Sequence, residues 1–191
     1  INLFNPNGQK ITLKGKWKIL HVSASPNIKK GLYRILELAE CLKNNPDFQF
    51  YLIGKQNEDP LCGKDIKFFD NVNYLGRIND RKLLAQYYRS CEIFIFPSED
   101  DCSPNVILEA MASGMPILTI DSGGIKELLI KENIQAGVFI DDKNPMMSLN
   151  NIISSYDKFK KNALYLSKKY YDFDLSAHKY TSLIQDLTQE K

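Results

Sequence analysis

The chain has 191 residues, of which 43% are hydrophobic, and its 25 lysines and arginines nearly balance 23 acidic residues. This composition excludes a disordered chain and a global attraction to nucleic acid or to an anionic membrane, and the length suits one domain with a sizeable core. No run reaches the roughly 18 apolar residues that a membrane-spanning helix needs.

Residues 1–16 carry no convincing core pattern, and we expect them to form a linker or leader. They lack a basic region followed by an apolar stretch, so no signal peptide is expected, and the missing initiator Met favours a piece of a longer chain. The four cysteines have no paired spacing, which predicts reduced, mostly buried thiols rather than a zinc site or disulfides. His21 and His178 lie far apart, which disfavours a His-centred triad.

Strand-like and helix-like segments alternate through the rest of the chain. Strands are expected at 17–23, 48–54, 72–76, 92–97, 116–120 and 137–140. Helices are expected at 32–44, 80–90, 103–113, 125–130 and from about 145 to 189 with a break near 172–174. This order predicts an α/β fold, a Rossmann-like doubly wound parallel sheet of about six strands that forms a single domain over 17–191. Ligands of such sheets bind beyond the carboxyl ends of the strands.

The most informative stretch, residues 98–110, leaves a buried strand as an acidic loop and enters a helix. Ser103 is a good N-cap, and Pro104 suits the first helical position. The start of this helix would offer free N–H groups to an anion. The residues that would offer them are Asn105, Val106 and Ile107.

Glu109 lies one turn into that helix among apolar neighbours, where a carboxylate needs a polar partner. The two hydroxyls of a ribose would supply one. A partly exposed glutamate behind an acidic surface loop fits the pattern equally well.

Three further segments are weaker signals. Lys30 and Gly31 end the loop that leads into the first helix, where a lysine either reaches a phosphate or is simply solvated. Gly123-Gly124 forms either a tight turn or a close backbone approach to a ligand. The segment from Gly76 to Asp80 is consistent with a strand end followed by a helix cap.

Together these segments resemble the C-terminal nucleotide-sugar-binding domain of GT-B glycosyltransferases of the large retaining family 4, the glycosyl transferases group 1. The resemblance covers about residues 17–190, nearly the whole chain. It rests on the order and spacing of Lys30-Gly31, Tyr74 to Arg77, Phe96 to Ser98, Asp101 to Pro116 and Gly123 to Glu127.

The resemblance implies a role for each matching position. Asp101 would hold hydroxyls of the donor sugar, Glu109 the ribose and Lys30 the diphosphate, and these three would form the catalytic set. Ile78 would contact the base through its backbone, and Asp80 would read a base edge. The remaining donor-binding positions would be Gly31, Arg77, Ser103, Pro104, Asn105 and Val106.

Two departures from the family pattern stand out. The first acidic position is usually Glu, and Asp101 is one methylene shorter. Many members also carry an Arg about six residues before the lysine, and residues 21–25 contain none. Lys29 or a neighbouring polar residue would then partly replace that phosphate clamp, or phosphate binding would be weaker.

The resemblance also implies an activity and its setting. A hexose would pass from a nucleoside diphosphate sugar to an acceptor hydroxyl with retention, in glycan or polysaccharide synthesis, without metal or other cofactor, although Asp100-Asp101 should be tested as a metal motif. An absent N-terminal domain would bind the acceptor, and the last helix, about 176–189, would pack toward it, so the chain alone would turn over little substrate. We expect a cytoplasmic location with peripheral membrane association through the full-length protein and no nucleic-acid partner. The alternatives are a non-catalytic nucleotide-binding or interaction module, or a sugar-nucleotide epimerase.

Overall fold

The computed structural model describes residues 3–55, 69–99 and 101–189. The strands are β1 (Trp17–Val22), β2 (Phe48–Ile53), β3 (Val72–Tyr74), β4 (Ile93–Phe96), β5 (Ile117–Thr119), β6 (Ile130–Lys131), β7 (Ile134–Gln135) and β8 (Gly137–Phe139). The helices are α1 (Leu32–Cys41), α2 (Arg81–Ser90), α3 (Asn105–Ala112), α4 (Ile125–Leu129), α5 (Pro145–Ser154), α6 (Tyr156–Tyr170) and α7 (Phe173–Gln189).

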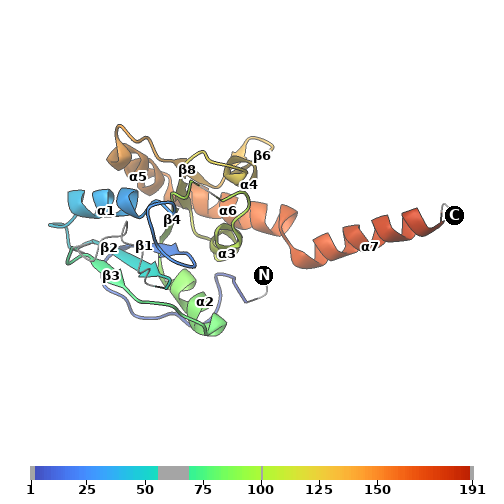
Figure 1. Ribbon diagram of the computed structural model, residues 1–191, viewed down its shortest axis with the longest axis horizontal. Coiled ribbons are helices and arrows are strands. Elements are labelled where there is room, and N and C mark those ends of the chain that lie inside the picture. Colours follow the sequence, from blue (N-terminus) through green and yellow to red (C-terminus); the bar gives the residue numbers. More distant parts are fainter. Residues whose placement is uncertain (1–2, 56–68, 100, 190–191) are drawn as a thin grey trace.

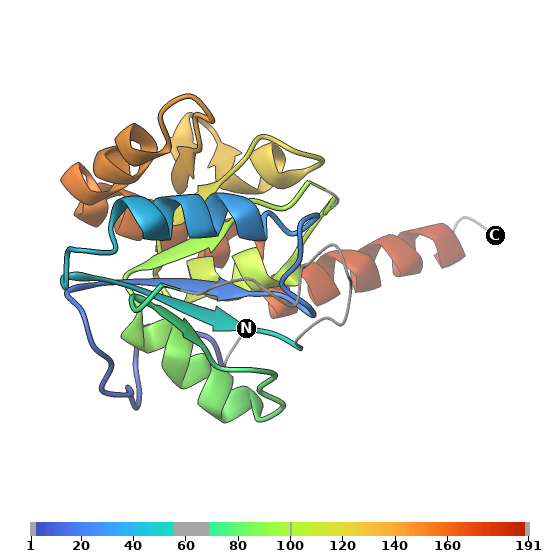
Figure 2. The same cartoon turned by 60° about the vertical axis from the view of Figure 1, so that its left-hand side comes forward.

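The main sheet has six parallel strands in the order β3-β2-β1-β4-β5-β8 (Figures 1 and 2). The chain runs outward from β1 to β3 and then returns to the other side of β1 with β4. The strand order therefore reverses between β1 and β4, and ligands of doubly wound sheets bind at such a switch point. The predicted Rossmann-like fold is confirmed.

Helices cover both faces of this sheet, which explains why the strands read as nearly continuous apolar runs. Successive β1 residues point to opposite faces: Ile19 packs into the core beneath α1 and α5, and Leu20 packs into the core beneath α2, α3 and α6. Both side chains have no exposed surface.

Local signals fix some of the helix ends. Asp80 caps α2 by accepting hydrogen bonds from the N–H groups of Lys82 and Leu83 at 2.8 and 3.3 Å. Gly114 follows α3 with a φ of +79°, a left-handed conformation that glycine adopts without strain. The predicted start of α3 was wrong by one position, because Pro104 is the N-cap and no side chain, Ser103 included, makes a capping hydrogen bond.

Two features were not predicted. Residues 130–135 form a small antiparallel hairpin of β6 and β7, whose turn residues Glu132 and Asn133 both have positive φ. Two-residue strands are too short to show an apolar period. The long C-terminal helical region breaks at Ser155 as well as at Tyr171 and Asp172.

The first residues pack against the domain, although their sequence shows no core pattern. The Phe4 side chain is 1% exposed and meets the Tyr88 ring edge-on, with ring centroids 5.3 Å apart. Arg89 donates to the carbonyl groups of Leu3 and Asn5. The few apolar residues of this segment do not recur at a regular interval, so the sequence did not reveal this contact.

The cysteines correct one prediction. Cys91 is buried, but Cys41 and Cys102 are exposed, and all three are free thiols. Cys62 lies outside the described residues. Within the described part of the chain, no helix is both long and apolar enough to cross a membrane.

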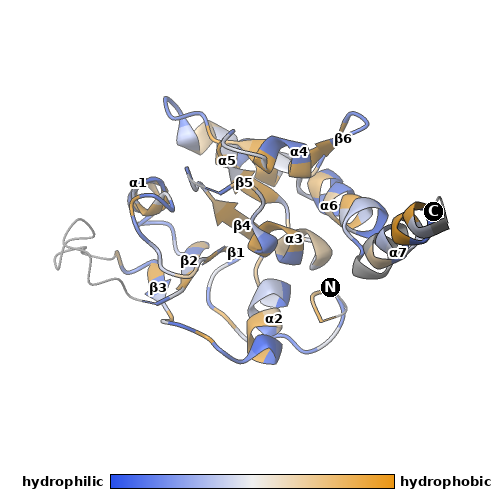
Figure 3. Ribbon diagram, turned by 45° about the vertical axis from the view of Figure 1, so that its right-hand side comes forward, coloured by the Kyte–Doolittle hydropathy of each residue, from blue (hydrophilic) through white to orange (hydrophobic). Residues whose placement is uncertain are grey.

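Helix α7 projects from the body of the domain (Figure 1). Four large apolar side chains recur along it at intervals of three and four residues and are 54–70% exposed. They are Tyr180, Leu183, Ile184 and Leu187. The hydropathy view shows apolar positions on this projecting helix (Figure 3).

Candidate functional site

The loops after β1 and β4 meet at the switch point of the sheet, as the strand order requires. Lys30 donates from Nζ to Oδ2 of Asp101 at 2.6 Å, and the Ser98 hydroxyl donates to the same oxygen. Burial would raise the pKa of the Asp101 carboxyl, but these two hydrogen bonds outweigh it and hold that pKa below its usual range. The two residues lie 71 positions apart in sequence.

A buried histidine lies behind this pair. Nδ1 of His21 lies 3.0 Å from the carbonyl oxygen of Ile95, and Nε2 lies 3.0 Å from Oγ of Ser23. Burial lowers the pKa of His21 to about 4, so its ring is neutral at pH 7. A carbonyl only accepts, so Nδ1 carries the proton and Nε2 accepts from the Ser23 hydroxyl. Ser23 therefore has only acceptor capacity left for other partners.

Three glycines let backbone segments meet closely around the pair. A Cβ at Gly31 would lie 2.1 Å from the carbonyl oxygen of Pro97. At Gly123 and Gly124 a Cβ would lie 2.6 and 2.4 Å from the carbonyl oxygens of Asp101 and Cys102. Gly123 and Gly124 thus approach the loop that carries Asp101, and their approach to a ligand stays a prediction.

Glu109 on α3 has partners within the protein. The Tyr88 hydroxyl donates to its Oε2 at 3.2 Å, and Arg81 donates from Nη2 to its Oε1 at 3.1 Å. The Glu109 side chain is 17% exposed, and burial raises the pKa of its carboxyl although both partners oppose this. Tyr88 and Arg81 therefore supply polar partners of the kind that a carboxylate among apolar neighbours needs.

The N-terminus of α3 opens toward the same edge. The N–H group of Ile107 donates to the Pro104 carbonyl at 3.0 Å, so the expectation of a free group at Ile107 was wrong. Among the described residues no backbone acceptor binds the N–H groups of Asn105 and Val106. The N–H groups of Asn105 and Val106, together with the positive end of the helix dipole, could therefore bind an anion.

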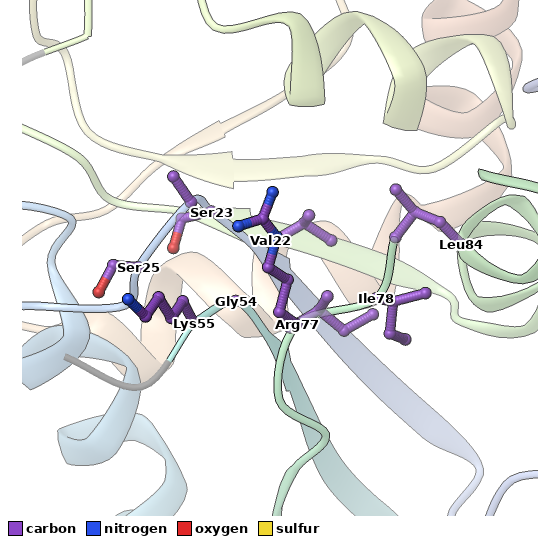
Figure 4. Close-up of a pocket in the computed structure, with 10 residues that line it drawn as sticks. Val22, Ser23, Ser25, Gly54, Lys55, Arg77, Ile78 and Leu84 are labelled. Atoms are coloured by element: carbon purple, nitrogen blue, oxygen red, sulfur yellow. The ribbon is translucent and has the colours of Figure 1, made fainter. Parts of the chain in front are cut away.

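A cavity of about 530 Å³ lies beyond the ends of β1, β2 and β3 (Figure 4). Its wall combines apolar side chains with hydroxyl and cationic groups. The lining residues are Val22, Ser23, Ala24, Ser25, Ile53, Gly54, Lys55, Arg77, Ile78 and Leu84. Among the described residues, Lys55 and Arg77 have no acidic partner. The buried Oγ of Ser25 has no hydrogen-bond partner among them either.

The sequence-predicted residues thus fall into two groups. Arg77 and Ile78 line the cavity, whereas Lys30 meets Asp101 beside Ser98. Asp80 lies at the start of α2 with Oδ1 already engaged as its cap. Ser103 and Asn105 are exposed beside the buried Pro104.

Sequence reasoning missed Lys55 and the hydroxyls of Ser23 and Ser25. Each follows the end of a strand, which was the available signal. Asp100 lies outside the described residues, and the described part of the chain holds no group of three His, Cys, Asp or Glu residues with metal-site geometry.

Comparison with known proteins places this geometry in a family. Residues 5–168 match the family Glycosyl transferases group 1. The chain is 29% identical over 183 residues to the N,N'-diacetylbacillosaminyl-diphospho-undecaprenol alpha-1,3-N-acetylgalactosaminyltransferase of Campylobacter jejuni, covering 87% of this chain and 46% of that protein. It spans between 33% and 46% of the length of the first curated relatives that it matches.

Solved structures agree in fold. The C-terminal domain of the group 1 glycosyl transferase LpcC from Francisella tularensis superposes with a TM-score of 0.71 at 21% identity, over 90% of this chain and 97% of that domain. Anabaena HepE, solved in complex with UDP, superposes with a TM-score of 0.73 at 19% identity, over 89% of this chain and 49% of HepE. The family match covers most of the chain, and the Rossmann-like sheet agrees with it: this chain belongs to the glycosyl transferases group 1.

Proposed function

We propose that the chain is the donor-binding half of a retaining glycosyltransferase of family 4, which transfers a hexose from a nucleoside diphosphate sugar to an acceptor hydroxyl. One observation carries this proposal. Lys30 and Asp101 meet at the switch point of the sheet, on the same edge as the N-terminus of the helix that bears Glu109. Lys30, which would bind a phosphate, and Asp101, which would bind a hydroxyl, thus lie on the same edge as a helix end that would bind an anion.

The nucleoside would occupy the cavity beside Ile78. Its apolar wall suits a base, and the backbone of Ile78 would contact that base. Glu109 would accept hydrogen bonds from the ribose hydroxyls, with Tyr88 and Arg81 keeping its carboxylate in place. Uridine is our first choice of base, because HepE was solved with UDP.

The diphosphate would lie between Lys30 and the free amides of α3. Lys30 would exchange its contact with Asp101 for a phosphate oxygen, and Asp101 would then accept from hydroxyls of the sugar. When the anomeric C–O bond breaks, the diphosphate would leave with the bonding electrons, the acceptor oxygen would bond to the anomeric carbon from the same side, and the acceptor proton would pass to the departing diphosphate oxygen. Lys30 and the helix end would stabilise the negative charge that develops.

Lys55 and Arg77 are our candidates to replace the arginine that residues 21–25 lack. Both line the cavity together with Ser25, which lies in the segment where many relatives carry that arginine. Two cations in one cavity favour an anionic group there. No divalent metal is needed for this charge balance.

We infer the setting of the reaction from the family. We propose that an N-terminal half binds the acceptor, that the apolar side of α7 packs on it, and that this chain alone turns over little substrate.

Assembly of a surface glycan is favoured by relatives such as the Campylobacter transferase and an O-antigen glycosyltransferase of Escherichia coli. We place the enzyme in the cytoplasm at the membrane surface. These relatives favour transfer over epimerisation or a non-catalytic role.

Thermal stabilisation by UDP, GDP and ADP, each with and without an attached sugar, tests the proposal. A ligand at a hundredfold its Kd adds about 2.7 kcal/mol to the free energy of unfolding, which raises the Tm by several degrees. We expect one nucleotide to stabilise the chain, its sugar form to do so more, and Glu109→Gln to lose most of the effect. Lys161→Gln, an exposed change on α6, should keep it. No stabilisation by any nucleotide would contradict donor binding by this chain.

A further inference from the structure

Arg34 lies on α1 one turn after Lys30, and its guanidinium joins two loops at the carboxyl edge of the sheet. Nε and Nη2 donate to the two carboxylate oxygens of Asp142, at 2.8 and 3.1 Å. Nη1 donates to Oε1 of Glu99 at 2.7 Å. Glu99 follows β4 and Asp142 follows β8, so one side chain ties both loops to α1. None of these three residues belongs to the donor site proposed above.

The contacts of Arg34 are better organised than those of an ordinary surface ion pair, which contributes about 0–1 kcal/mol. The Arg34 side chain is only 12% exposed. Its planar fork binds Asp142 through two parallel hydrogen bonds, a geometry that loses little entropy on forming. The Tyr33 hydroxyl also donates to Oε1 of Glu99, at 2.9 Å. Two hydrogen bonds, a stronger effect from Arg34 and a weaker one from Tyr33, lower the pKa of the Glu99 carboxyl.

The backbone of Glu99 is in turn bound to two neighbouring segments. Its N–H group donates to the carbonyl oxygen of Lys29 at 3.0 Å, and its own carbonyl accepts from the Ser122 hydroxyl at 2.8 Å. Lys29 directly precedes Lys30, and Asp101 follows two residues after Glu99. The anchor at Glu99 therefore joins the segment that carries Lys30 to a residue two positions before Asp101.

We propose that Arg34 is a positioning residue, which holds Glu99 against α1 and thereby keeps Asp101 in contact with Lys30. The effect of Arg34 on Asp101 concerns this chain alone. Its consequence for the donor rests on the proposed function: loss of Arg34 should weaken binding of the sugar, which Asp101 would hold, and leave binding of the nucleotide nearly unchanged.

The first test measures the pKa of the Asp101 carboxyl by carbon-13 NMR in the 191-residue chain. We expect that pKa to rise toward its usual value in Arg34→Gln, because the contact with Lys30 loosens, and to rise less in Arg34→Lys, which keeps the positive charge but not the planar fork. Lys18→Gln is the matched control. Lys18 is 15% exposed and pairs with Glu92 at 3.0 Å at the opposite end of β1. An Asp101 pKa that is unchanged in Arg34→Gln, or that rises equally in Lys18→Gln, would overturn the proposal.

The second test compares the Kd values of UDP and UDP-glucose by calorimetry. In Arg34→Gln we expect the affinity that glucose adds over UDP to fall about threefold or more, while the Kd of UDP stays within about twofold. Equal losses for both ligands would overturn the positioning role. If the wild-type chain binds neither ligand, the proposed function fails for uridine donors, and the Asp101 titration still decides the role of Arg34.

Discussion

The ammonium nitrogen of Lys30 and a carboxylate oxygen of Asp101 lie 2.6 Å apart, so two charges of the proposed donor site neutralise each other within the protein. Each side chain is about one quarter exposed, at 24% and 25%. The pair is thus open enough to exchange partners, and the cost of separating the two charges is moderate at such exposure. A phosphate that replaces Asp101 on Lys30 returns a charge-assisted contact of the same kind.

Replacing Lys30 by Gln should weaken nucleotide binding. A hydrogen bond to a charged group contributes about 1.5–3 kcal/mol, so the Kd for UDP should rise about tenfold or more. Calorimetric titration of the chain with UDP measures this. Lys82→Gln, at the exposed start of α2, is the control and should keep the wild-type Kd. A Lys30→Gln chain that binds UDP as tightly as the wild type would remove Lys30 from the diphosphate site.

Burial of His21 should make stability depend on pH. Its pKa is lowered from 6.5 to about 4 in the folded protein, so the unfolded chain binds more protons between these values. Stability is therefore lost as the pH falls from 6.5 toward 4, by up to about 3 kcal/mol from this group. Urea unfolding across this range should show a smaller loss for His21→Gln than for the wild type. His178→Gln, exposed on α7, should retain the wild-type slope.

Alanine substitutions at Gly31 and Gly76 can separate two contributions to the loss of stability, steric overlap and an unfavourable backbone conformation. Both glycines have left-handed φ values, +71° and +70°, but an added Cβ meets the Pro97 carbonyl at 2.1 Å at Gly31 and no atom within 4 Å at Gly76. Gly76→Ala should cost about 1–2 kcal/mol for its backbone conformation alone. Gly31→Ala should cost about 1–3 kcal/mol more, because α1 must move away from Pro97. Equal losses in urea unfolding would show that the contact at Pro97 yields freely.

Phe4→Ala should destabilise the domain by about 3–5 kcal/mol, as expected for a fully buried aromatic side chain. Its ring supports Tyr88, whose hydroxyl holds Glu109, so the affinity for UDP should fall as well. Leu183→Ala on α7, where the side chain is 54% exposed, should change stability by less than about 0.5 kcal/mol. A small effect of Phe4→Ala would show that residues 3–16 are not part of the folded unit.

Long, strongly patterned elements could be predicted from the sequence because burial on both faces of a parallel sheet leaves runs such as 92–97 nearly free of polar residues. The hairpin of β6 and β7 could not, since its conformation depends on two positive φ values rather than on hydrophobic pattern. The core contact of Phe4 is formed by a segment without periodicity. Tertiary packing alone determines such contacts.

Some residues of the candidate site could likewise be placed from the sequence, and others could not. Lys30 and Asp101 follow β1 and β4, so topology alone brings them to one edge. The partners of Glu109 could not be inferred, because Tyr88 and Arg81 reach it from α2 through side-chain geometry. Arg34 gave no signal, since a charged residue on an amphipathic helix is ordinarily read as part of its solvated face.

The loop that carries Asp101 is confined on two sides, by Gly31 against Pro97 and by Gly123-Gly124 against the carbonyl groups of Asp101 and Cys102. A side chain added at any of these three glycines would overlap a backbone carbonyl group, so a loop of another length would have to keep these contacts unchanged. During evolution, related enzymes with this framework would acquire preference for a different sugar by exchanging side chains, such as Asp for Glu at position 101, while the length of the loop stays constant. Divergence among such enzymes should therefore appear as substitutions here and as insertions elsewhere.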